Sequence, residues 1–138
     1  MAYWLLKTEP DDFSWEEQCA RGKKGEPWTG VRNAQARNNL LAMKKGDLAF
    51  FYHTGAERRI VGVVQVIKEA YQDPTTDDKR WVVVDVVAKE PAPKPVTLQA
   101  IKASPKLGDM TLVKNSRLSV QPVKEAEWRL IRKMGGFE

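Results

Sequence analysis

Short runs of hydrophobic residues along this chain predict several strands. The runs at 60–71 and 80–89 are rich in β-branched residues, which favour strands. A third run, 47–52, is rich in aromatic residues, and a shorter one at 3–7 ends before Pro10, which lacks the N–H of a strand ladder. Because the three longest strands follow one another with short turns, we expect them to pair antiparallel in a curved sheet or small barrel.

Helical spacing and capping residues predict helices that pack outside this sheet, so the expected class is α+β. Ser14 and Glu17 form the pattern of a capping box, Asn33 is a plausible N-cap, and Thr97 can cap a short helix. In the last helix the apolar residues recur at helical spacing, and two glycines follow it. The expected helices are 14–21, 33–43, 97–103 and 123–134.

Prolines and one glycine mark the remaining features. The three alternating prolines of 91–95 predict a stiff connector that excludes regular sheet pairing. Residues 104–115 are expected to be irregular, and a short strand at 117–120 should stop before Pro122. Gly62, inside a strong strand pattern, indicates a bulge or the close approach of another backbone or a ligand.

Composition narrows the class of protein. The 138 residues are expected to form one domain, 1–138, which is long enough to bury a core without disulfides or metals. A single cysteine, Cys19, excludes an internal disulfide and favours a reducing, cytoplasmic compartment. The apolar runs fall far short of the roughly 20 residues of a membrane helix, and no signal peptide is expected. We expect no cofactor and no metal, and we assume a monomer.

Charge and aromatic content point to a polyanionic partner. The net charge is +5 and the chain has five tryptophans, and bases stack on exposed aromatic rings. Trp4, Trp81 and Trp128 lie in apolar patterns and are expected in the core, and Trp15 is expected to pack under its helix. Trp28 belongs to no apolar pattern, so ligand contact is favoured for it, with core packing as the alternative.

Catalytic patterns are scarce. His53 is the sole histidine, so a Cys–His pair would have to join it to Cys19, which is predicted on an unrelated element. No phosphate-binding loop and no His/Cys cluster for a metal is present in the sequence. A binding function is therefore favoured over catalysis.

Three segments that each follow or flank a strand are predicted to converge on one site: 7–10, 28–38 and 52–55. Trp28 is expected to stack on a base, and Glu9 and Asn33 to pair with its polar edge. Asn33 has an alternative role as a helix cap, and His53 an alternative role in a turn hydrogen bond. The predicted ligand-binding residues are Lys7, Thr8, Glu9, Trp28, Gly30, Val31, Arg32, Asn33, Arg37, Tyr52 and His53.

Ordered motifs along nearly the whole chain resemble the EVE domain. They are 3–10 (YWLLKTEP), 28–33 (WTGVRN) with 36–38 (ARN), 46–53 (GD to FFYH), 60–62 (IVG) and 118–123 (LSVQPV) followed by Trp128. The resemblance implies a PUA-like fold, a small, mostly antiparallel β-barrel flanked by helices, with kinship to ASCH and YTH modules. It also implies a nucleic-acid partner, DNA or RNA, and recognition of a modified base, notably modified cytosine in DNA.

Similarity to YTH readers implies a pocket formed by Lys7–Glu9 and 31–33. Those readers close the pocket with an aromatic cage, and Arg32 stands where a cage aromatic is expected. Either Trp28 takes that place or the cage is incomplete. We therefore expect a non-catalytic module that holds a modified base, with Lys7, Arg32 and Arg37 holding the nucleic-acid backbone or polar substituents. The alternatives are an RNA-binding PUA-type module without modification preference and a nucleotide or RNA hydrolase that uses Glu9 and His53.

Overall fold

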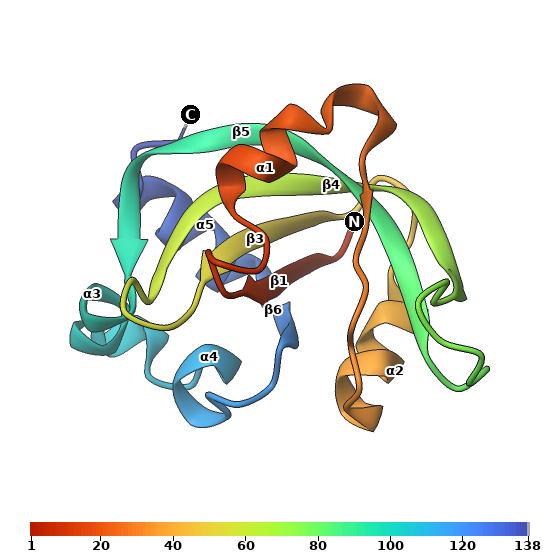
Figure 1. Ribbon diagram of the computed structural model, residues 1–138. Helices are drawn as coiled ribbons and strands as arrows, with labels where there is room; N and C mark the ends of the chain where they lie inside the picture. The colour runs from red at the N-terminus through yellow and green to blue at the C-terminus, as the bar shows by residue number, and fades with distance from the viewer. Residues whose placement is uncertain (138) are drawn as a thin grey trace.

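The computed structural model describes residues 1–137 and contains one sheet with helices on both faces (Figure 1). The strands are β1 (Tyr3–Thr8), β2 (Glu26–Pro27), β3 (Leu48–His53), β4 (Arg59–Gln72), β5 (Val82–Thr97) and β6 (Val120–Val123). The helices are α1 (Trp15–Ala20), α2 (Ala34–Ala42), α3 (Leu98–Ala103), α4 (Thr111–Lys114) and α5 (Glu125–Met134), with 3₁₀ turns η1 (Gly22–Lys24) and η2 (Pro105–Leu107). None of the described helices is long and apolar enough to span a bilayer.

The strand order is β2-β5-β4-β3-β1-β6. The predicted antiparallel pairing of β3, β4 and β5 is confirmed, as is the α+β class. Strand β1 pairs parallel with β3 and antiparallel with β6, a connection that the order of elements along the chain did not predict. Because β2 and β6 are the two edges, the sheet is open within residues 1–137, and the expected barrel is corrected to a bent sheet; Figure 1 shows the bend in β4 and β5.

Alternating side chains of the central strands bury both faces of the sheet. On one face Leu6, Phe51 and Val64 meet the side chains of α2, and on the other Leu5, Phe50 and Val63 meet those of α3 to α5. Helix α1 lies over the first face and α5 over the second (Figure 1). Both faces are thus inaccessible along most of the sheet, which leaves its ends and loops for function.

The expectation that the prolines of 91–95 exclude sheet pairing is wrong. Strand β5 runs through them and pairs with β4, with Pro91 opposite Gly62 and Val96 opposite Ile60. Five steps along β5 match two along β4, so the prolines lie in a wide irregularity. Their rings are exposed, and an irregular strand has no ladder position that requires their missing N–H groups.

Two other boundaries also differ from expectation. Residues 104–115 contain η2 and α4 rather than irregular chain only, and Pro122 lies inside β6 opposite Trp4 instead of ending the strand. Proline is tolerated there because β6 is an edge strand and Pro122 is exposed.

The predicted positions of the tryptophans hold for Trp4 and Trp128, which are buried, but not for Trp81. Trp81 lies one residue before β5, is only partly buried, and has guanidinium groups rather than apolar side chains around its ring. The apolar run begins here in a loop, so its first hydrophobic residue lies outside the sheet.

The bulge predicted at Gly62 is confirmed, and the group that approaches it closely is a side chain rather than a backbone or a ligand. The β3–β4 and β4–β5 registers both shift beside it, and the Trp15 indole lies directly against it. A Cβ atom at residue 62 would stand 2.5 Å from the Trp15 ring. Trp15 in turn packs edge-on against Phe51, with ring centroids 5.3 Å apart.

We expect Gly62→Ala to lower the free energy of unfolding by about 1–3 kcal/mol, because the added methyl displaces the Trp15 indole from a packed site. Chemical denaturation measures the change. Gly108→Ala is the matched control, since its Cβ would have its nearest neighbour at an ordinary 3.7 Å. If Gly62→Ala lowers the free energy of unfolding by the same amount in a Trp15→Leu background as in the wild type, the proposed clash is wrong.

Candidate functional site

A cavity of about 590 Å³ opens at the carboxyl ends of β1 and β3. The parallel register sets Thr8 opposite His53, so both strands leave the sheet at the same edge. Ligand sites of sheets with parallel strands form at such ends. The cavity is lined from β1 and the residues after it, from the segment 26–30, from Thr54, and from 116–119. Each of the three segments predicted to converge therefore reaches the cavity only in part, with residues 7–9 of the first, 28–30 of the second and Thr54 of the third.

Lys7 forms one wall near the end of β1. Its ammonium donates a hydrogen bond to the Ser116 carbonyl and lies 5.8 Å from the centroid of the Tyr52 ring. Burial lowers the pKa of the Lys7 amine from its ordinary value. The cation is therefore held in place at the rim, where it can donate to a polar ligand.

Glu9 is positioned by the turn that follows β3. The Thr54 hydroxyl donates to Glu9 Oε1 at 3.0 Å, and the Thr54 N–H donates to the Thr8 carbonyl at 2.9 Å. Gly55 adopts a φ of +73°, and a Cβ there would stand 2.8 Å from the Glu9 carboxylate. The glycine thus gives the turn its conformation and leaves space for the carboxylate.

The aromatic side of the cavity is formed by Trp28 and Phe13. Trp28 is 6% exposed and packs edge-on against Phe51 at 5.5 Å and Phe13 at 6.1 Å, so it belongs to the core and to the cavity wall together. Its backbone N–H donates to the Val84 carbonyl at 2.8 Å. The core thus holds the Trp28 ring in place, and the ring contributes aromatic surface to the cavity.

Charges of both signs surround the opening. Arg21 pairs with Glu26 at 2.8 Å and lies 5.3 Å from the centroid of Phe13. The charged residues that line the cavity are the cations Lys7, Arg21 and Arg117 and the carboxylates Glu9, Asp12, Glu17 and Glu26. Such a set offers donors and acceptors to a planar polar ligand. No group of three or more His, Cys, Asp or Glu side chains suited to a metal occurs in the described part of the chain.

Five of the eleven predicted residues line the cavity: Lys7, Thr8, Glu9, Trp28 and Gly30. The other six lie elsewhere. Val31 is buried in the core under α2, and Asn33 caps α2 by accepting a hydrogen bond from the Ala36 N–H at 2.9 Å. Arg37 is held by the Asn38 side chain and lies 5.7 Å from the centroid of Trp81.

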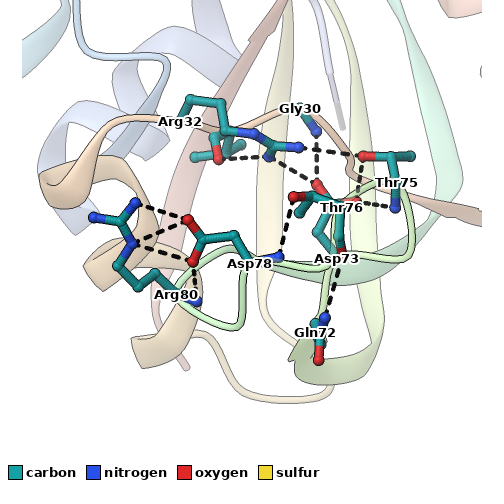
Figure 2. A network of polar contacts seen from close by, with 9 residues as sticks. Gly30, Arg32, Gln72, Asp73, Thr75, Thr76, Asp78 and Arg80 are labelled. Atoms are coloured by element: carbon teal, nitrogen blue, oxygen red, sulfur yellow. Dashed lines mark hydrogen bonds and ion pairs between the residues drawn. The ribbon is translucent and has the colours of Figure 1, made fainter.

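Arg32 turns away from the cavity toward the buried carboxylate of Asp73 (Figure 2). The same carboxylate accepts the Gly30 N–H at 3.0 Å and both the N–H and the hydroxyl of Thr75. Burial alone would raise the pKa of Asp73, but these hydrogen bonds and the Arg32 guanidinium outweigh it and lower the pKa to about 2. Asp73 thereby fixes both the cavity rim at Gly30 and the direction of Arg32.

Tyr52 and His53 are buried and do not line the cavity. Tyr52 lies in the core of the opposite face, where burial raises the pKa of its phenol. His53 Nε2 accepts the Trp15 N–H at 3.1 Å, so Nδ1 carries the proton and donates to Glu57 at 2.8 Å. Both ring nitrogens thus serve the start of α1 and the turn before β4.

Sequence reasoning missed the residues that reach the cavity through long-range contacts. Phe13 and Arg21 lie beyond the two ends of α1, and its capping box predicted the helix but not which part of the sheet it covers. Arg117 and Ser119 line the cavity because the following strand, β6, pairs with β1, which lies more than 100 residues away in sequence. The short apolar pattern that precedes Pro122 signalled a strand there, but gave no indication of its partner.

Apart from its open sheet, this helix-flanked α+β structure with a cavity at the ends of β1 and β3 agrees with the PUA-like class that the sequence motifs implied. The profile of the EVE domain matches residues 2–134, and the chain belongs to the EVE domain family, as the sequence motifs predicted. Mouse thymocyte nuclear protein 1 is 37% identical over 94% of this chain and 71% of its own length.

Solved structures of related proteins are similar to this chain over nearly its whole length. A crystal structure of a protein from Agrobacterium tumefaciens is 50% identical with a TM-score of 0.97, covering 99% of this chain and 94% of that chain. Human THYN1, solved in complex with DNA containing 5-methylcytosine, is 31% identical with a TM-score of 0.91, covering 100% of this chain and 99% of that one. A YTH domain from Zygosaccharomyces rouxii, at 17% identity and a TM-score of 0.59 over 97% of this chain and 86% of its own, shares the fold.

The low pKa of Asp73 predicts acid-sensitive stability. A carboxylate whose folded pKa is about 2, against an ordinary 3.8, stabilises the fold above pH 4 by at most about 2 kcal/mol, and this contribution disappears as the pH falls from 4 through 2. We therefore expect the stability difference between the wild type and Asp73→Asn to be large at pH 7 and to shrink toward pH 2. Denaturation at several pH values measures it.

Asp77→Asn is the control, since Asp77 is an exposed carboxylate of the same loop. It should leave stability within about 0.5 kcal/mol of the wild type throughout. A difference between wild type and Asp73→Asn that does not change with pH would contradict the assigned role of the ionised carboxylate.

Proposed function

We propose that this protein is a non-catalytic nucleic-acid-binding module that holds a modified base in the cavity at the ends of β1 and β3. The observation that carries the proposal is the cavity itself, whose volume of about 590 Å³ lies within the range of small-molecule sites and whose walls combine aromatic rings with charged groups. The structure of human THYN1 with DNA containing 5-methylcytosine, which matches the whole chain, supports this choice of ligand. The preferred probe is therefore 5-methylcytosine in DNA.

The chemistry of the walls suits an extruded cytosine. The exocyclic amine of cytosine is a donor, which the Glu9 carboxylate can accept, and the ring carbonyl is an acceptor for Lys7. Trp28 and Phe13 supply aromatic surface for the ring and its methyl group. Extrusion of a base costs a few kcal/mol of unstacking, which these contacts must offset.

Two alternatives make different predictions. A plain RNA-binding module would bind modified and unmodified RNA equally. A hydrolase would need Glu9 and His53 to act on one ligand, yet His53 lies outside the cavity with its two ring nitrogens engaged by Trp15 and Glu57. The geometry favours binding over hydrolysis. An intracellular site of action, in cytoplasm or nucleus, is part of the proposal, since relatives are named nuclear proteins.

We expect Glu9→Gln and Trp28→Leu to weaken binding of a 5-methylcytosine oligonucleotide by about tenfold or more. Glu9→Gln removes a charged acceptor, and Trp28→Leu removes aromatic surface worth roughly 1–3 kcal/mol per base. Fluorescence anisotropy with DNA and RNA of one sequence, with and without the methyl group, measures the affinities.

Glu16→Gln is the matched control, because Glu16 is an exposed carboxylate on α1 that does not line the cavity. Since Trp28 also belongs to the core, thermal unfolding of each variant separates lost binding from lost stability. Unchanged affinity of the exposed Glu9→Gln variant for every probe would overturn the assignment of the cavity.

A further inference from the structure

Three arginines surround the ring of Trp81, outside the cavity. Their guanidinium carbons lie 5.8 Å (Arg32), 5.7 Å (Arg37) and 5.4 Å (Arg80) from the centroid of the indole. They come from three separate segments, namely the chain before α2, α2 itself and the loop between β4 and β5. We call Trp81 with these three arginines the guanidinium cluster.

The cluster contributes little to the stability of the fold. The Arg32 side chain is 40% exposed and that of Arg80 69% exposed, and cation–π contacts at exposed sites each contribute only about 0.5–1 kcal/mol. Carboxylates offset the charges of Arg32 and Arg80, but within residues 1–137 the charge of Arg37 is not offset in this way. A polyanion placed on the cluster would supply the missing counter-charge, whereas the protein's own apolar core gains little from the cluster.

The counter-charges within the protein are incomplete. Asp73 pairs with Arg32 at 2.9 Å and Asp78 with Arg80 at 2.7 Å (Figure 2). Arg37 has no carboxylate partner in residues 1–137, and its Nε and Nη2 donate to the side-chain amide oxygen of Asn38. The three guanidiniums are therefore fixed in direction, and Arg37 keeps both its uncompensated charge and unused donors. Guanidinium donors held this way match the oxygens of a phosphate.

One carboxylate links the cluster to the rim of the cavity. The carboxylate of Asp73 accepts one hydrogen bond from Arg32 of the cluster and another from the N–H of Gly30, which lines the cavity. A strand that placed one base in the cavity would thus carry its neighbouring phosphates past Arg32 toward Arg37 and Arg80. Phosphate contacts of this kind position a nucleic acid without reading its sequence.

We propose that the guanidinium cluster binds the phosphodiester backbone of the strand whose base occupies the cavity. Arg37 and Arg80 contact phosphate, and Trp81 is a positioning residue that orients the guanidiniums. The proposal rests on the nucleic-acid-binding function proposed above, and it assigns affinity to the cluster and base preference to the cavity.

Arg37→Gln and Arg80→Gln test the cluster, with Arg129→Gln as the matched control on α5, which packs on the opposite face of the sheet. The probes are a 5-methylcytosine oligonucleotide, its unmodified counterpart, and free 5-methyl-2′-deoxycytidine, which carries no phosphate. Affinities are measured at several salt concentrations by fluorescence anisotropy and calorimetry.

Each cluster variant should bind both oligonucleotides about three- to tenfold more weakly, with the ratio between them unchanged. The slope of log K against log salt should fall by roughly 0.7–0.9 for each phosphate that the variant no longer neutralises. Nucleoside affinity should stay at the wild-type value, which also shows that the variants are folded. Trp81→Leu should reduce oligonucleotide affinity and salt slope, and Trp81→Phe should restore them.

Wild-type affinity and salt slope in both Arg37→Gln and Arg80→Gln would overturn the proposed phosphate binding by the cluster, but not the proposed base binding by the cavity. A reduced slope in these variants, in a protein that shows no preference for the modified base and no affinity for the nucleoside, would support the cluster and overturn the base pocket. The two failures are therefore distinguishable in one set of titrations.

Discussion

The parallel pairing of β1 with β3 is tied at its start by the buried carboxylate of Asp47. Its Oδ2 accepts the Trp4 indole N–H and the Lys44 backbone N–H, and its Oδ1 accepts the Ala2 N–H. A buried carboxylate needs all of these donors, so it fixes the beginnings of the two strands relative to each other. The register that follows brings Thr8 beside His53 at the other end. The cavity exists because both strands end at that edge.

Around this edge, the same residues stabilise the fold and shape the cavity. Trp28 packs against Phe51 and lines the cavity with its remaining surface, and the turn at Thr54 both extends the pairing with β1 and holds Glu9. Rigid surroundings of this kind hold a site in place before a ligand arrives, which lowers the entropy cost of binding. The position of the cavity is thus set by packing, whereas its selectivity would come from a few polar groups at the rim.

Local patterns predicted the local parts of this structure. The capping box at Ser14, the Asn33 cap and the antiparallel pairing of β3 to β5 all follow from short-range spacing, and all are confirmed. The partner of β1, the path of the 91–95 prolines and the arrival of Arg117 at the cavity depend on contacts between distant segments. Hydrophobic period alone carries no information about those contacts.

The segment 28–38 shows the same limit within the candidate site. Arg32, Asn33 and Arg37 were predicted to face one ligand, but Asn33 caps α2, and Arg32 pairs with the buried Asp73. Asp73 lies in a loop whose sequence is that of an ordinary polar turn, so the sequence does not indicate that this carboxylate is buried and needs hydrogen-bond donors. A buried carboxylate without donors costs several kcal/mol, which is more than an exposed arginine gains from any one direction of its side chain. Arg32 therefore points to Asp73. One buried charge therefore separates the stretch into two surfaces, with Trp28 and Gly30 at the cavity and Arg32 and Arg37 on the ring of Trp81.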